Sequence, residues 1–148
     1  KKIAALLEQA GYRVVLTRNS DTGLYDENES NKKAQDMQRR CEIIEREDPI
    51  LTLSIHQNSY PQDASVRGPQ VFYYENSKEG EKLEVARPRV QKGNSTYYIL
   101  KRSKAVTVIV ECGFLTNPQE EALLQEEEYQ DRMAQAVCDG VMEYLGND

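Results

Sequence analysis

The sequence predicts an α/β protein, a three-layer α/β/α domain with a mostly parallel central sheet. Over the first 56 residues, helical and strand-like patterns alternate in the order helix, strand, helix, strand, which is typical of a parallel sheet covered by helices. The 148 residues are enough to bury a sizeable core, and no repeat or low-complexity linker divides them. We therefore expect a single domain over residues 1–148.

The composition argues against several classes of protein. The chain has 19 basic and 25 acidic side chains and a formal net charge of −6, so a nucleic-acid partner is not expected. It holds no apolar run of membrane-spanning length. Cys41, Cys112 and Cys138 are too widely spaced for a disulfide framework or a zinc knuckle, and we expect buried free thiols. The chain begins inside a predicted helix, which is compatible with an export signal having been removed.

The first helix–strand pair covers residues 1–17. Apolar side chains form one stripe over residues 1–10, which predicts a helix, and Gly11 follows as its C-terminal cap. β-branched and aromatic residues predict a strand over residues 12–17. Residues 18–30 are polar and are expected to form a long loop.

The second helix–strand pair leads to the only histidine. A helix is expected over residues 31–46, and Asp48-Pro49 ends it. Residues 50–55 then predict a buried strand with His56 at its carboxyl end. The segments that follow, in order, are a loop over 57–69, a strand over 70–74, a charged irregular stretch over 75–94 and a short apolar run over 95–100.

The last part of the chain repeats the strand-to-helix pattern. Residues 107–110 (Thr-Val-Ile-Val) are strongly strand-like and lead into Glu111. Asn117, Pro118 and Glu120 have the pattern of a helix start, with a capping residue, proline in the first turn and glutamate three residues on. A final helix is expected over residues 127–145.

Two predicted strands therefore end in a titratable side chain, His56 and Glu111. Ligands bind outside the carboxyl ends of the strands in open α/β sheets. A neutral imidazole and a carboxylate in that place suit a metal site, or a metal ligand beside a general base. His56 is also compatible with a hydrogen-bonded structural role. A carboxylate directly after Thr-Val-Ile-Val is costly to bury unless it is paired or used.

A Cys112–His56 nucleophile pair is the competing hypothesis. It conflicts with a role for Glu111, because adjacent residues of a strand point to opposite faces unless a bulge intervenes. Asn58 and Asn117 are candidates for orienting ligands or substrate, although asparagine is also typical of turns and helix caps.

Four motifs follow one another along the chain: Leu16-Thr17-Arg18 with Asp21, Leu53-Ser54-Ile55-His56-Gln57-Asn58, Gly68-Pro69-Gln70-Val71-Phe72-Tyr73-Tyr74, and Val110-Glu111-Cys112-Gly113-Phe114-Leu115-Thr116-Asn117-Pro118. In this order they resemble the zinc-dependent N-acetylmuramoyl-L-alanine amidases of the amidase 3 family, and within it the spore-cortex amidases. The similarity covers nearly the whole chain.

The resemblance implies the three-layer fold, a Zn²⁺ cofactor and hydrolysis of the amide bond between N-acetylmuramic acid and L-alanine in peptidoglycan. It implies that His56 is a zinc ligand, that Glu111 is the catalytic residue acting on the zinc-bound water, and that Arg40 is structural. It also implies an extracytoplasmic location, in the cell wall or spore cortex; any activating protein partner is unidentified. Candidates for substrate contact are Gln57, Asn58 and Asn117.

The chain departs from the family pattern in two places. The N-terminal strand and glycine-rich loop with the first zinc histidine, and the ligand glutamate after them, have no counterpart, so two further ligands are expected outside this chain. A helix near residues 83–90 is also expected to be missing. A catalytic zinc site takes three protein ligands, so we expect a polypeptide of only these residues to bind zinc poorly. The alternative hypothesis is a metal-free peptidoglycan- or partner-binding module derived from the amidase fold.

Overall fold

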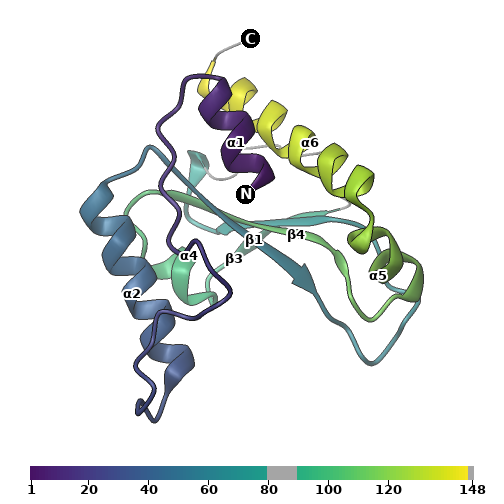
Figure 1. Cartoon of the computed structure of the whole chain (residues 1–148), viewed down its shortest axis with the longest axis horizontal. Coiled ribbons are helices and arrows are strands. Elements are labelled where there is room, and N and C mark those ends of the chain that lie inside the picture. Colours follow the sequence, from purple (N-terminus) through teal and green to yellow (C-terminus); the bar gives the residue numbers. More distant parts are fainter. Residues whose placement is uncertain (80–89, 147–148) are drawn as a thin grey trace.

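A computed structural model describes residues 1–79 and 90–146, and within them a four-stranded sheet lies between two layers of helices (Figure 1). The strand order is β1-β4-β2-β3. The parallel pairs are β1 (Leu51–Asn58) with β4 (Val106–Phe114) and β2 (Gln70–Tyr74) with β3 (Val90–Asn94), whereas β2 and β4 are antiparallel. The α/β class and the three layers are confirmed, with a sheet that is mixed rather than mostly parallel.

The antiparallel pairing of β2 with β4 has a local cause. A crossover between parallel strands takes a dozen or more residues and usually contains a helix. Residues 59–69, which connect β1 to β2, contain neither a helix nor a strand. The chain therefore turns back, and β2 enters the sheet in the opposite direction to β1.

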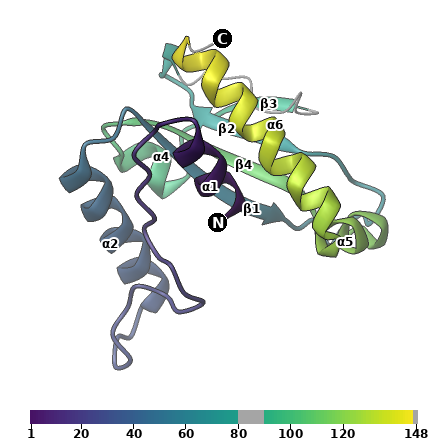
Figure 2. The same ribbon diagram turned by 45° about the horizontal axis from the view of Figure 1, so that its top comes forward.

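Helices cover both faces of the sheet. Figures 1 and 2 show α1 (Lys2–Gln9) and α6 (Glu127–Leu145) side by side on one face, with α2 (Lys32–Glu47) and α4 (Tyr98–Arg102) on the other. The short helix α5 (Pro118–Gln125) joins β4 to α6. Within the described part of the chain, none of the helices is long and apolar enough to cross a membrane.

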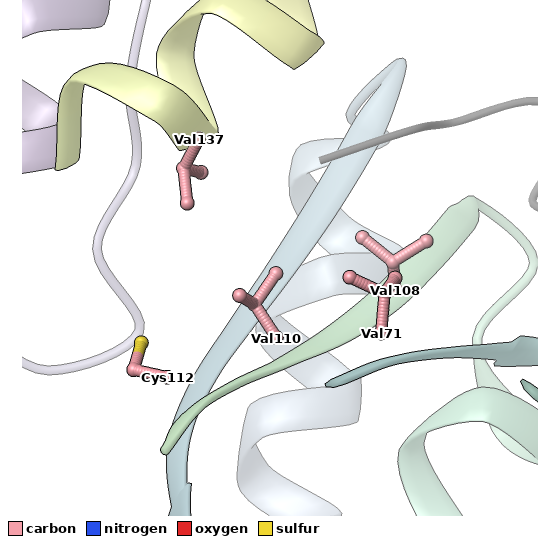
Figure 3. Close-up of a cluster of buried hydrophobic side chains, with 5 residues drawn as sticks. All are labelled: Val71, Val108, Val110, Cys112 and Val137. Carbon is pink, nitrogen blue, oxygen red and sulfur yellow. The ribbon is translucent and has the colours of Figure 1, made fainter. Parts of the chain in front are cut away.

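Strand alternation divides the core into two main clusters. On the α6 side, the cluster consists of Val71, Val108, Val110, Cys112 and Val137, and Figure 3 shows Val137 of α6 above the valines of β2 and β4. On the α2–α4 side, the cluster consists of Ile44, Phe72, Ile99, Leu100 and Ile109. Neighbouring residues of β4 thus belong to opposite clusters, as the two-residue period of a strand requires.

Residues 12–17 are extended but form no strand, so this prediction was wrong. Tyr12 and Val14 pack against the cluster between α1 and α6, while Val15 and Leu16 are 41% and 48% exposed. A strand exists only where another backbone lies about 4.8 Å away to complete the ladder. The nearest strand, β1, lies across a groove from this segment. These residues have a high β propensity, but no neighbouring backbone among the described residues lies close enough to pair with them.

The groove beside β1 is a cavity of about 900 Å³. It is lined by the extended residues 12–18, by α2 on one side and by α1 and α6 on the other. Leu51, Leu53, Ile55 and Gln57 line it from β1. Among the strands that the structure describes, β1 pairs only with β4, so the outer edge of β1 faces this groove.

Two predictions concern the segment before β4. The stretch over residues 75–94, expected to be irregular, contains β3 at its end, and the apolar run over 95–100 contains the start of α4. The helix expected to be missing near residues 83–90 falls on a segment that, except for residue 90, lies outside the described residues.

Candidate active site at the ends of the parallel strands

His56 and Glu111 lie side by side where β1 and β4 approach their carboxyl ends. They are direct partners in the parallel register of the two strands. Register partners project from the same face of a sheet. Glu111 follows Ile109 by two residues, and Ile109 belongs to the cluster on the α2–α4 side. The imidazole and the carboxylate therefore project together toward that face.

The His56 ring is held in its neutral form. Partial burial lowers the pKa of His56 below the ordinary value, and the positive charges of Arg40 and Arg18 lower it further. The ring Nε2 lies 2.9 Å from Ser54 Oγ, one strand period earlier on the same face. Neutral imidazole is the form that binds a metal ion, and the residue is still exposed to solvent.

Glu111 is a buried carboxylate, and one of its two oxygens lacks a hydrogen-bond partner among the described residues. The residue is 7% exposed, and its Oε2 has no hydrogen-bond partner among residues 1–79 and 90–146. Burial raises the pKa of Glu111 above the ordinary value. Buried carboxylates are normally satisfied, so the free oxygen points to a missing partner such as a water, a metal ion or a substrate group.

Cys112 takes no part in this pair. It projects to the opposite face, into the cluster with Val110 and Val137. Burial, with a further contribution from Glu111, raises the pKa of the Cys112 thiol to about 11. A thiol that is neutral at physiological pH and packed in the core is not an activated nucleophile, so the geometry does not support the Cys112–His56 hypothesis.

Gln70, which is not among the site residues predicted from the sequence, flanks Glu111 on its other side. It is the register partner of Glu111 in the antiparallel pairing of β2 with β4, and it is 8% exposed. Its Oε1 accepts a hydrogen bond from Asn58 Nδ2 at 3.1 Å. This bond joins β1 to β2 beside the carboxylate. A glutamine at the first position of a buried strand was the signal in the sequence.

The three residues predicted to contact substrate lie in different surroundings. Asn58 ends β1 and forms the bond to Gln70. Gln57 is exposed and lines the groove on the far side of β1. Asn117 is 6% exposed; its Oδ1 caps α5 and its Nδ2 donates to the Ala64 carbonyl at 2.8 Å. Of the three, only Asn58 is therefore bonded to a register partner of Glu111.

Glu120 is a second buried carboxylate, and its contacts differ from those that its position in the helix suggests. In a capping box the glutamate would bond the backbone N–H of the cap residue, here Asn117. Instead, Glu120 Oε2 accepts from the Phe114 N–H at 2.8 Å and Oε1 accepts from the Gly68 N–H at 2.9 Å. It thereby joins the end of β4 to the loop before β2.

Tyr97 and Arg40 complete the surroundings of the pair. The Tyr97 ring meets Phe72 edge-on at 5.3 Å, and burial together with the charge of Glu111 raises the pKa of its phenol. Arg40 Nε donates to Asp36 Oδ2 at 2.6 Å. Burial alone would raise the pKa of Asp36, but the Leu24 N–H and Arg40 lower it. This pairing is consistent with the structural role predicted for Arg40.

The described side chains fit part of a zinc site. A neutral imidazole and a buried carboxylate with a free oxygen have the right chemistry. However, within the described ranges no group of three or more His, Cys, Asp or Glu side chains is arranged to hold a metal ion. A catalytic zinc site needs three protein ligands. The described residues therefore do not form a complete zinc site.

Comparison with known proteins connects this geometry to one family. The family described as N-acetylmuramoyl-L-alanine amidase (Amidase_3) matches residues 1–143. The germination-specific N-acetylmuramoyl-L-alanine amidase of Bacillus subtilis is 32% identical over 158 residues, which is 97% of this chain and 66% of the relative. The amidase LytC of the same organism is 29% identical over 97% of this chain and 29% of its own length. The chain thus spans less than two thirds of these curated relatives.

Solved structures confirm the fold. The CwlD amidase from Clostridioides difficile, solved in complex with the GerS lipoprotein, superimposes with a TM-score of 0.93 at 31% identity, over 99% of this chain and 82% of that one. The catalytic domain of the amidase CwlV from Bacillus (Paenibacillus) polymyxa var. colistinus superimposes with a TM-score of 0.81 at 26% identity, over 99% of this chain and 80% of that one.

Proposed function

The chain belongs to the Amidase_3 family of N-acetylmuramoyl-L-alanine amidases, and from that premise we propose that this protein hydrolyses the amide bond between N-acetylmuramic acid and L-alanine in peptidoglycan. The observation that carries the proposal is the register pair of His56 and Glu111, in which a neutral imidazole stands beside a buried carboxylate with a free oxygen.

Glu111 is the proton acceptor and donor of the proposed reaction. Its free Oε2 takes a proton from the attacking water and returns it to the leaving amine of L-alanine. Burial raises the pKa of Glu111, which makes the carboxylate a stronger base. Its proton affinity is thereby closer to those of the attacking water and the leaving amine.

His56 is one ligand of a proposed zinc ion. A zinc ion bound there would supply a nucleophile at neutral pH and polarise the scissile carbonyl. Partial burial and the charges of Arg40 and Arg18 keep the ring neutral, which is what a ligand requires. The remaining ligands lie outside this set of side chains, as expected from the family pattern.

We also propose that a further strand fills the groove beside β1 and brings the missing ligands. The groove runs along the open edge of β1 and is walled by helices on both sides, which is the environment of a strand inside a three-layer domain. A strand parallel to β1 would end at the same edge as His56, so residues following it would reach the imidazole. The greater length of the relatives leaves room for such a segment.

For the substrate, Asn58 is the proposed contact nearest to Glu111. Gln57 is proposed to contact substrate or the added strand from the groove side of β1. Asn117 is proposed to act indirectly, through the loop before β2, because its side chain is engaged by α5 and Ala64.

The place of action is proposed from the relatives. A germination-specific amidase and a CwlD amidase bound to a lipoprotein are among them. We propose that this protein likewise acts outside the cytoplasm, on cell wall or spore cortex, and that it binds a protein partner. Both parts of the proposal are tested by purifying this protein from cell-envelope extracts prepared with and without their membrane-anchored proteins, and by identifying the proteins that co-purify with it.

Muropeptide release and zinc content test the proposed function. The full gene product is expected to bind zinc and to release L-alanine-terminated peptides from purified peptidoglycan, whereas residues 1–148 alone are expected to bind zinc poorly and to release little. Full activity from residues 1–148 alone would contradict the ligand argument.

A metal-free binding module is the second candidate function. The observation in its favour is that the described residues do not by themselves form a three-ligand cluster. In that case the full gene product would bind peptidoglycan without releasing peptides, and Glu111→Ala would leave binding unchanged. Zinc-dependent release by the full gene product excludes this alternative.

A further inference from the structure

The turn after β4 and the start of α5 hold the 59–69 loop in place from outside the sheet. This loop connects β1 to β2, and its flanking residues Asn58 and Gln70 are hydrogen-bonded through their side chains at 3.1 Å. Gln70 is the register partner of Glu111 on one side, as His56 is on the other. The placement of the loop therefore sets the placement of the polar groups next to the carboxylate.

Glu120 uses both carboxylate oxygens for this purpose. It accepts the Gly68 N–H of the loop at 2.9 Å and the Phe114 N–H of β4 at 2.8 Å, and the residue is 8% exposed. A side-chain Cβ at Gly113 would lie 3.3 Å from Glu120 Oε2, so glycine at this position lets the carboxylate approach β4. The charge is satisfied by two backbone donors from separate segments, which fixes their separation.

Asn117 has two separate tasks. Its Oδ1 caps α5 by accepting two backbone N–H groups at 3.1 Å. Its Nδ2 donates to the Ala64 carbonyl in the middle of the loop at 2.8 Å.

The start of the loop is also bonded to the turn after β4, because the Tyr60 N–H donates to Thr116 Oγ1 at 2.9 Å. The loop is thus bonded at its beginning, middle and end.

We propose that Asn117 and Glu120 are positioning residues of the hydrolase site, acting through the 59–69 loop to hold Asn58 and Gln70 beside Glu111. The inference rests on the proposed function and deepens it. Neither side chain is free to bind substrate, because their polar atoms are engaged within the protein. Displacement of a supporting group by about 1 Å can lower a rate about 100-fold.

One substitution separates the two tasks of Asn117. Asn117→Asp keeps an oxygen at the helix cap, where Asp and Asn are about equally favourable, but offers no N–H to the Ala64 carbonyl. Glu120→Gln keeps the size of the side chain and replaces one acceptor oxygen by an NH₂ group, which cannot accept a backbone N–H. Glu121→Gln is the matched control, since the Glu121 side chain accepts from Gln125 within α5.

The variants are compared in the full gene product, loaded with zinc, through kcat and KM for muropeptide release, zinc content and thermal unfolding. Asn117→Asp and Glu120→Gln are expected to bind zinc like the wild type and to stay folded at the assay temperature. Their kcat is expected to fall about 10-fold or more, with KM changed less than about 3-fold. Glu121→Gln is expected to match the wild type in every measurement.

Wild-type kcat in folded Asn117→Asp would overturn the inference, and so would a loss of kcat that only follows the loss of folded protein. If Glu120→Gln does not fold, Asn117→Asp decides alone, because the helix cap is preserved in it. A zinc-loaded wild type that releases no peptide refutes the proposed function, and the positioning role falls with it. An active wild type with equally active variants refutes the positioning role alone.

Discussion

His56 and Glu111 are register partners on neighbouring parallel strands, so an imidazole and a carboxylate meet on one face of the sheet without any loop to place them. Both strands belong to the central sheet, and their side-chain directions follow from the pleat. This relationship is the basis of the first two predictions, which separate the chemistry of Glu111 from its cost in stability.

Replacement of Glu111 by Ala or Gln is expected to lower muropeptide release by about 10²–10⁴-fold, the usual contribution of a general acid–base group. The variants should retain the circular dichroism of the wild type, because Glu111 Oε2 has no partner to lose among the described residues. The rate is measured in the full gene product with zinc. Release at the wild-type rate would show that another group moves the proton.

The same Glu111→Gln variant is expected to be more stable than the wild type at pH 7, by about 1 kcal/mol. Burial raises the pKa of Glu111 in the folded state, so the folded protein loses stability as the pH rises through the unfolded and then the folded pKa. The difference should disappear below about pH 4, where the carboxyl is protonated in both states. Urea unfolding of both proteins at the two pH values checks this, and equal stability at pH 7 would contradict it.

Replacement of His56 by Ala is expected to lower the zinc affinity of the full gene product by at least about 100-fold, because it removes a ligand and not only a supporting contact. Ser54→Ala, which removes only the hydroxyl 2.9 Å from His56 Nε2, is the comparison variant and should lower the affinity less than His56→Ala does. Competition with a chelator measures both. Unchanged affinity in His56→Ala would exclude His56 from the ligand set.

Replacement of Cys112 by Ala is expected to leave muropeptide release within about 3-fold of the wild type and to cost about 1 kcal/mol of stability, through the space left in the core beside Val137. In the wild type at pH 8, the thiol should resist alkylation because burial raises its pKa to about 11. Cys41, which is less buried, should react first. Mass spectrometry identifies the labelled residue, and loss of activity on Cys112 labelling would revive the thiol hypothesis.

The groove beside β1 is expected to bind an apolar dye such as 1-anilinonaphthalene-8-sulfonate in residues 1–148 but not in the full gene product. Val15, Leu16 and Ile55 around it are 41%, 48% and 42% exposed, which is an apolar surface unusual for a finished domain. A further strand would cover it. Equal dye fluorescence from both proteins would contradict the proposed occupant of the groove.

Much of the site was predictable because its signals are local. An apolar run that ends in a titratable residue predicts the carboxyl end of a strand, and this pattern made His56 and Glu111 candidates, which the structure places as register partners. The helix start at Asn117 was also readable, since the Asn117 side chain accepts two backbone N–H groups of the first turn and Pro118 lacks an N–H that would need a partner there.

Only the tertiary structure decided the interactions between segments that are far apart in the chain. Residues 12–17 have the composition of a strand, yet a strand requires a neighbouring backbone, and a groove lies where that neighbour would be. Glu120 has the position of a capping-box residue, yet its oxygens bond Gly68 and Phe114. The sequence by itself determined which residues are candidates for the chemistry, through patterns of apolar and polar residues. Their partners depended on the packing of distant segments, because hydrogen bonds form with whatever backbone the fold brings near.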